Sequence, residues 1–113
     1  MIVLGLALAL PLGAIAAEAE SKKFTLISVI FDGTKVWLPS TLIVHEGDQV
    51  GLTLINKLDA PHGFKIAGLG IDAVLQPLAK TTMWFTASKV GVHPFICHLH
   101  PPHIGGQILV LAK

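Results

Sequence analysis

Apolar residues after position 23 occur in short runs separated by turn residues, and this pattern restricts the fold more than any other feature of the chain. No window of about eleven residues keeps a helical apolar period without interruption by Gly, Pro or a β-branched cluster. The runs that favour strands cover residues 24–31, 36–44, 50–55, 63–67, 81–87, 92–97 and 107–111. Pro39 divides the second run, and we interpret residues 68–77 as a loop-rich connection. We therefore expect an all-β domain, a Greek-key β-sandwich of about seven or eight mostly antiparallel strands.

The first residues differ in composition from this domain. Residues 2–17 form an uninterrupted apolar stretch, and Ala16 and Ala19 each complete an A-x-A pattern of the kind at which signal peptides are cleaved. We interpret residues 1–19 as a signal peptide and residues 20–113 as the domain, exported to the periplasm or out of the cell. A retained membrane anchor is the alternative, although a stretch of about sixteen residues is short for a span.

Charge and cysteine content narrow the range of functions. Lys outnumbers Asp and Glu by eight to seven, which gives a net charge of +1, and the chain has no Arg. This composition argues against a nucleic-acid binder, which would need a basic face. The single cysteine, Cys97, excludes a disulfide within the chain, so an exported thiol needs another reason to be present.

Histidines surround that cysteine. The segment C-H-L-H-P-P-H-I-G-G, residues 97–106, places His100 and His103 at regular spacing after Cys97 between two expected strands. His62, in the turn D-A-P-H-G-F, is the best candidate for a further ligand. One thiolate with several imidazoles suits copper or zinc, so we expect a metal site formed by these four residues. The remaining histidines are assigned to surface, packing or hydrogen-bonding roles: His45, His93 and His98.

Three motifs resemble those of the cupredoxins, which are copper proteins with a Greek-key β-sandwich. They are L-P-S-T-L-I-V-H-E-G-D-Q-V from Leu38, P-H-G-F from Pro61, and V-G-V-H-P-F-I-C-H-L-H-P from Val90, and the resemblance covers nearly all of residues 24–112. The third motif is similar to that of nitrosocyanin-like red copper proteins and of plastocyanin- and amicyanin-type carriers. The resemblance implies one copper ion per chain, with a mid-chain His, a Cys and a loop His as ligands. It also implies that Asn56 holds the ligand loops together by hydrogen bonds.

The sequence departs from the usual cupredoxin pattern at the axial ligand. Met1 and Met83 are the methionines of the chain, and neither lies in the ligand loop. His103 stands where some short-loop cupredoxins have their axial Met, although a surface role for His103 stays open at this point. A strong nitrogen donor there should weaken the copper–thiolate bond and lower the reduction potential. We therefore expect a red or green centre rather than a blue one.

These observations favour an exported one-electron carrier over an enzyme, acting with a redox partner protein that the sequence does not name. An apolar rim formed by Leu99, Pro101, Pro102 and Ile104 suits weak encounters with that partner. The alternatives are a copper site with an open position for a small molecule, copper delivery or storage in the periplasm, and a structural zinc site. No membrane span is expected in the mature protein unless the leader is retained, and the oligomeric state stays open.

Overall fold

Residues 21–99 and 103–113, which the computed structural model describes, form nine strands and one short 3-10 helix. The elements are β1 (Ser21–Phe31), β2 (Thr34–Leu38), β3 (Thr41–His45), β4 (Gln49–Asn56), β5 (His62–Ile66), η2 (Ala67–Leu69), β6 (Ile71–Leu75), β7 (Lys80–Thr86), β8 (Gly91–Phe95) and β9 (Gly106–Leu111). Within the described residues, no helix has the length and apolar character needed to cross a membrane. The expected leader, residues 1–19, lies outside the described part of the chain.

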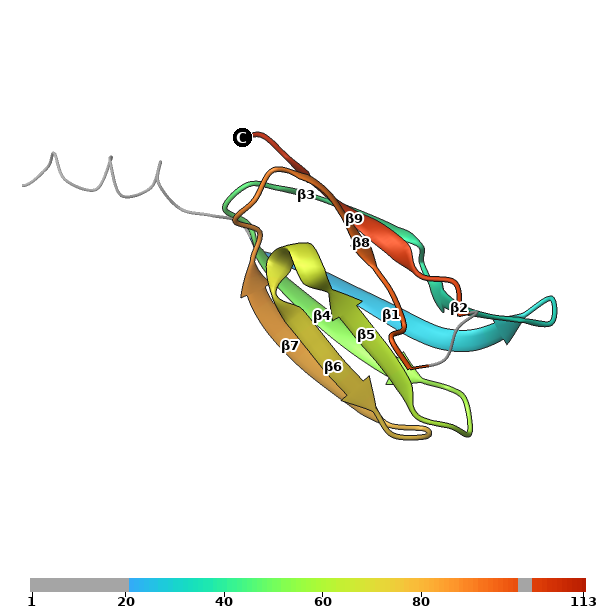
Figure 1. The fold of residues 1–113 in the computed structure, drawn as a ribbon. Coiled ribbons are helices and arrows are strands. Elements are labelled where there is room, and N and C mark those ends of the chain that lie inside the picture. The colour runs from blue at the N-terminus through green and yellow to red at the C-terminus, as the bar shows by residue number, and fades with distance from the viewer. Residues whose placement is uncertain (1–20, 100–102) are drawn as a thin grey trace, which may run out of the picture.

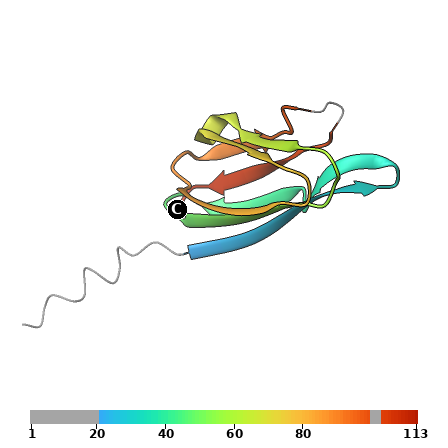
Figure 2. The ribbon, with the colours of Figure 1, turned by 90° about the horizontal axis from the view of Figure 1, so that it is seen from below.

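The strands form two main sheets and a hairpin. The larger sheet has the order β2-β1-β4-β7, the smaller has the order β3-β9-β8, and β5 pairs with β6 (Figure 1). Two pairings, β1 with β4 and β3 with β9, are parallel, and the other four are antiparallel. Figure 2 shows the larger sheet and the hairpin as separate layers. The prediction of an all-β sandwich with mostly antiparallel strands is therefore confirmed.

Alternation along the strands decides which side chains enter the core. In β4, Val50, Leu52 and Leu54 are fully buried, while Gln49 is exposed and Thr53 and Ile55 are partly so. In β7, Met83 and Phe85 pack against the core, while Trp84 between them and Thr82 and Thr86 on either side are exposed. Because successive side chains point to opposite faces of a strand, one face of β4 and one face of β7 supply most of their contribution to the core. The aromatic part of that core is Trp37, Phe64 and Phe95.

The interpretation of residues 68–77 as a loop-rich connection is wrong. This stretch contains the end of η2 and the strand β6, which pairs with β5 from Ile66↔Ile71 to His62↔Leu75. Glycines and Pro77 obscured a five-residue alternation in which Asp72 and Val74 are exposed while Leu75 is buried. The hairpin matters for the site, because its first strand begins at His62.

Candidate metal centre

Backbone pairing brings Cys97 beside the hairpin. Ile96 exchanges two hydrogen bonds with Lys65 of β5, with N···O distances of 2.9 and 3.0 Å. Cys97 follows directly, is buried, and accepts a hydrogen bond at Sγ from the backbone N–H of Gly63 at 3.2 Å. Hydrogen bonds to a cysteine sulfur are one of the means by which a protein tunes a metal–thiolate centre. This backbone pairing therefore places the thiol within reach of the first residue of β5.

That first residue is His62, and its side chain is fully buried. The His62 Nδ1 atom lies 3.7 Å from the Cys97 Sγ atom. A metal ion that binds both atoms would have bonds of about 2.3 Å to sulfur and about 2.0 Å to nitrogen. With a sulfur–metal–nitrogen angle between the tetrahedral and the trigonal value, these bonds place the two donor atoms roughly 3.5–3.8 Å apart. The observed separation fits two ligands of one metal ion.

Asn56, the last residue of β4, fixes the loop that leads to His62. Its Nδ2 atom lies 2.8 Å from the carbonyl oxygen of Ala60 and 3.2 Å from those of Leu75 and Gln76. Its Oδ1 atom accepts a hydrogen bond from the backbone N–H of Leu58 at 3.0 Å. Asn56 therefore holds one of the two ligand loops, the one that leads to His62, and the same side chain also ties the end of β6 to it.

His103 enters the site from the other side of the ligand loop. It is 8% exposed, and its ring centroid lies 4.9 Å from that of His62. One potential ligand atom from each of His62, Cys97 and His103 lies within 4.8 Å of the others. Pairing of the next residue, Ile104, with β2 anchors this arrangement through Trp37 N–H to Ile104 O at 3.1 Å and Ile104 N–H to Lys35 O at 2.9 Å. The structure thus groups His103 with the other two donors in the interior.

Of the other four histidines, His100 lies outside the described residues, as do Pro101 and Pro102. The structure describes His45, His93 and His98. His45 is exposed, and the Nε2 atom of half-buried His93 lies 2.8 Å from the carbonyl oxygen of Lys89, as their assigned roles predict. His98 packs across Gly63, so closely that a Cβ on that glycine would lie 2.5 Å from His98 Nδ1. Its Nε2 atom is 3.4 Å from an Asp72 carboxylate oxygen, so this histidine braces the hairpin from outside.

Two polar residues of the site were missed in the sequence. Ser28 of β1 is fully buried, and its Oγ atom lies 3.0 Å from His103 Nε2. The indole Nε1–H of buried Trp37 donates to the carbonyl oxygen of Gly63 at 3.2 Å. Ser28 stands two residues after Leu26 and therefore faces the core, so a hydroxyl that follows Phe24 and Leu26 on the same face was the available signal.

The sequence of residues 2–110 matches the family of cupredoxin-like domains. The chain belongs to this family. The thiolate, the imidazoles and their separation fit a copper ion, which such soft and borderline donors bind well. In this cupredoxin, His62, Cys97 and His103 are the described residues that could hold it.

Solved structures of larger copper enzymes share the fold. A copper-containing nitrite reductase from Thermus scotoductus is 26% identical, with a TM-score of 0.69, over 84% of this chain and 28% of that chain. A copper nitrite reductase from Nitrosomonas europaea is 22% identical, with a TM-score of 0.71, over 82% of this chain and 42% of that chain. A blue copper oxidase from the same organism is 21% identical, with a TM-score of 0.68, over 82% of this chain and 39% of that chain. This chain therefore spans less than half of each of these proteins, and the likeness concerns the fold.

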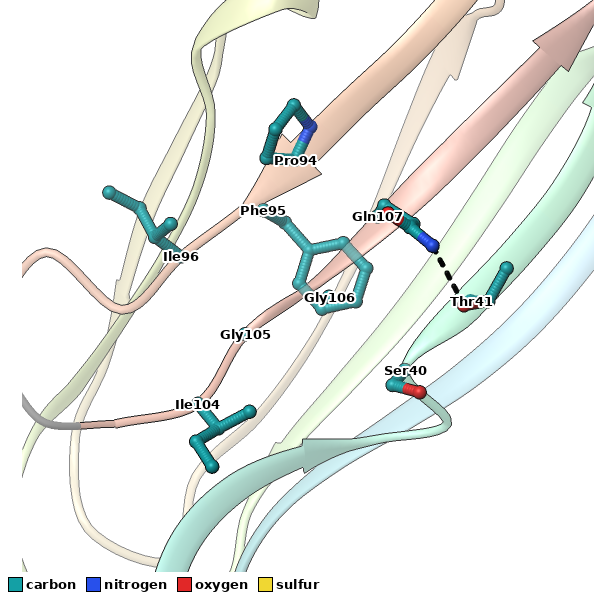
Figure 3. A pocket seen from close by; sticks show the side chains of 9 residues that line it. All are labelled: Ser40, Thr41, Pro94, Phe95, Ile96, Ile104, Gly105, Gly106 and Gln107. Atoms are coloured by element: carbon teal, nitrogen blue, oxygen red, sulfur yellow. Dashed lines mark hydrogen bonds between the residues drawn. The ribbon is translucent and has the colours of Figure 1, made fainter.

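A hollow of about 470 Å³ lies between the segments that lead into and out of the ligand loop (Figure 3). Pro94, Ile96 and Ile104 give it apolar walls, and Gly105 and Gly106 expose bare backbone. A Cβ on Gly105 would lie 1.9 Å from the carbonyl oxygen of Phe95, so the close approach of these segments requires glycine there. Ile96, which precedes Cys97, and Ile104, which follows His103, are 49% and 55% exposed and form apolar surface at this hollow.

Proposed function

We propose that this cupredoxin is an exported one-electron carrier that binds one copper ion through His62, Cys97, His100 and His103. The observation that carries the proposal is the buried convergence of a thiol and two imidazoles, with the His62 Nδ1 atom 3.7 Å from Cys97 Sγ. His100 is included on its spacing after Cys97 in the sequence. A bound copper ion would supply exchange of a single electron between its two common oxidation states.

The surroundings of the donors support electron transfer rather than substrate chemistry. His62 is fully buried, Cys97 is 5% exposed, and the Trp37 ring lies 6.0 Å from the ring of His103, centroid to centroid, so the described donors are shielded from water. Asn56 and the Ile96–Lys65 pairing hold the donors on rigid backbone, which limits rearrangement when the charge of the centre changes.

The absence of methionine from the ligand loop supports a red or green centre. A nitrogen donor at position 103 would bind more strongly than a thioether and would favour the oxidised ion, so the potential should be lower than with an axial Met. Partner contact would use the apolar surface at Ile96, Leu99 and Ile104, which are 49%, 39% and 55% exposed. A net charge of +1 would provide little electrostatic steering, so encounters should be weak and brief.

Export rests on the apolar leader of residues 2–17, and it is tested by comparing the mass of the protein in the periplasmic and cytosolic fractions of the host cell. The protein in the periplasmic fraction should have the mass of the chain without the leader. A full-length protein in the membrane fraction would favour the retained anchor instead.

The copper proposal is tested by titrating the purified protein with cupric ion while absorption, paramagnetic resonance and voltammetry are recorded. We expect a coloured one-to-one complex that cycles reversibly. Cys97→Ser should abolish the thiolate-to-copper band, whereas His45→Ala, a control at an exposed histidine, should leave it unchanged. A colourless protein that retains zinc in the presence of copper would refute the proposal. A spectrum that shifts with azide would favour an open site, and copper released to an acceptor chelator within minutes would favour delivery.

A further inference from the structure

We propose that the hydroxyl of Ser28 positions His103 and makes Nδ1 the nitrogen that His103 offers to a metal. This inference rests on the proposed function, because it assumes that His103 is a ligand. Ser28 and His103 are 75 residues apart in sequence, and both are buried, Ser28 completely. In the described part of the chain, His103 Nε2 at 3.0 Å is the hydrogen-bond partner of this buried hydroxyl.

The protons of the metal-free chain can be assigned from the partners of the two ring nitrogens. His103 Nδ1 lies 3.2 Å from the carbonyl oxygen of Ile104, which can only accept a hydrogen bond. In a neutral imidazole, Nδ1 therefore carries the proton, and Nε2 accepts the hydrogen bond that the Ser28 O–H donates. Both ring nitrogens are thus engaged, and a metal must displace one of the two contacts.

Displacing the contact at Nδ1 costs less. The carbonyl oxygen of Ile104 also accepts the backbone N–H of Trp37 at 3.1 Å, so it keeps a partner when Nδ1 turns to a metal. The single ring proton then moves to Nε2, and the proton count of the ring is unchanged. Ser28 Oγ accepts from the new Nε2–H, because a hydroxyl can donate or accept.

Binding through Nε2 has the opposite consequence. The metal would take the place of the Ser28 hydroxyl, and a fully buried O–H would lose its hydrogen bond to His103. An unpaired buried hydroxyl is unfavourable, since it has lost its hydration and gained nothing in return. Ser28 therefore selects Nδ1, orients the ring, and makes the ligand more basic through the bond at Nε2.

The first test needs no variant. Long-range proton–nitrogen NMR correlations of the histidine rings should show the Nδ1–H form of His103 in the metal-free protein. After anaerobic loading with Cu(I), the same ring should be in the Nε2–H form. A Cu(I)-loaded protein in which Nδ1 keeps its proton would overturn the inference.

The second test is a double-mutant cycle on copper affinity and on the visible spectrum of the Cu(II) form. Ser28→Ala should weaken copper binding about 10–100-fold and alter the spectrum, as removal of partners behind a ligand does elsewhere. Ser28→Thr, which keeps the hydroxyl, should restore much of the affinity. In a His103→Met background, Ser28→Ala should change neither quantity, because a thioether has no N–H to donate. Thr25→Ala removes an exposed hydroxyl from the same strand and should have no effect.

An equal effect of Ser28→Ala in both backgrounds would show a merely structural role and would overturn the inference, while leaving the copper proposal intact. A wild-type protein that forms no coloured copper complex would instead overturn the proposed function. Thermal unfolding of each metal-free variant separates loss of fold from loss of the ligand.

Discussion

Asn56→Ala should destabilise the metal-free protein by about 3 kcal/mol. The Nδ2 group has two hydrogens to share among the carbonyl oxygens of Ala60, Leu75 and Gln76, and Oδ1 accepts one further bond from Leu58 N–H. Three hydrogen bonds are therefore lost together, at about 1 kcal/mol net for each. For a domain of this size, that loss lowers the melting temperature by roughly 12–24 °C.

The assay is denaturant and thermal unfolding of the metal-free protein, followed by circular dichroism. Asn56→Asp is the decisive partner variant, because it keeps the size and Oδ1 but turns a carboxylate oxygen toward three carbonyl oxygens. We expect it to be at least as destabilising as alanine. The control is Gln49, which lies in the same strand as Asn56 and forms an exposed hydrogen bond of 2.9 Å to Thr86. Gln49→Ala should lower the free energy of unfolding by less than about 0.5 kcal/mol. If Asn56→Asp were nearly as stable as the wild type, packing rather than hydrogen bonding would explain the residue and the reasoning would fail.

Two further substitutions test the centre itself. His103→Met should move the copper absorption toward blue and raise the potential, both measured on the loaded protein, and an unchanged spectrum would remove His103 from the ligand set. Gly63→Ala places a Cβ 2.5 Å from the His98 ring, so the ring must shift from its present place 3.4 Å from Asp72, and the protein should lose about 1–3 kcal/mol in thermal unfolding. Adding His98→Ala should recover part of that loss, whereas simple additivity of the two substitutions would show that the clash with His98 is not the cause.

The sandwich could be predicted because alternation is a local property. The alternation of Val50, Leu52 and Leu54 predicts a strand with one buried face, and β4 has that buried face in the structure. The hairpin strand β6 was missed because Ile71–Leu75 is short and lies between Gly70 and Pro77, so turn signals outweighed its alternation. Local reasoning is weakest for strands that owe their existence to a partner, as β6 does to β5.

The grouping of Cys97 with His62 could be predicted from the chemistry of the two side chains and from the resemblance to cupredoxins. Its geometry could not, because it depends on backbone pairing between segments that are far apart in the sequence. The two hydrogen bonds between Ile96 and Lys65 set the positions of both donors, yet neither residue is itself a ligand. Trp37 also contributes at a distance in sequence, through its bond to the carbonyl oxygen of Gly63. Side chains that act on a ligand from another strand become visible only when the register of the sheets is known.

The contact with Ser28 affects which side chain is favourable at position 103. A histidine there satisfies the buried hydroxyl of Ser28, whereas a thioether is only a weak acceptor for it. His103→Met should therefore lower the stability of the metal-free protein as well as change the colour of the copper form, because Ser28 would lose a good partner in a site that excludes water. Ser28 and His103 thus form a matched pair across the two ends of the domain sequence. In the proposed centre, the choice of a nitrogen over a sulfur at position 103 would depend on the strand that carries Ser28 as much as on the ligand loop.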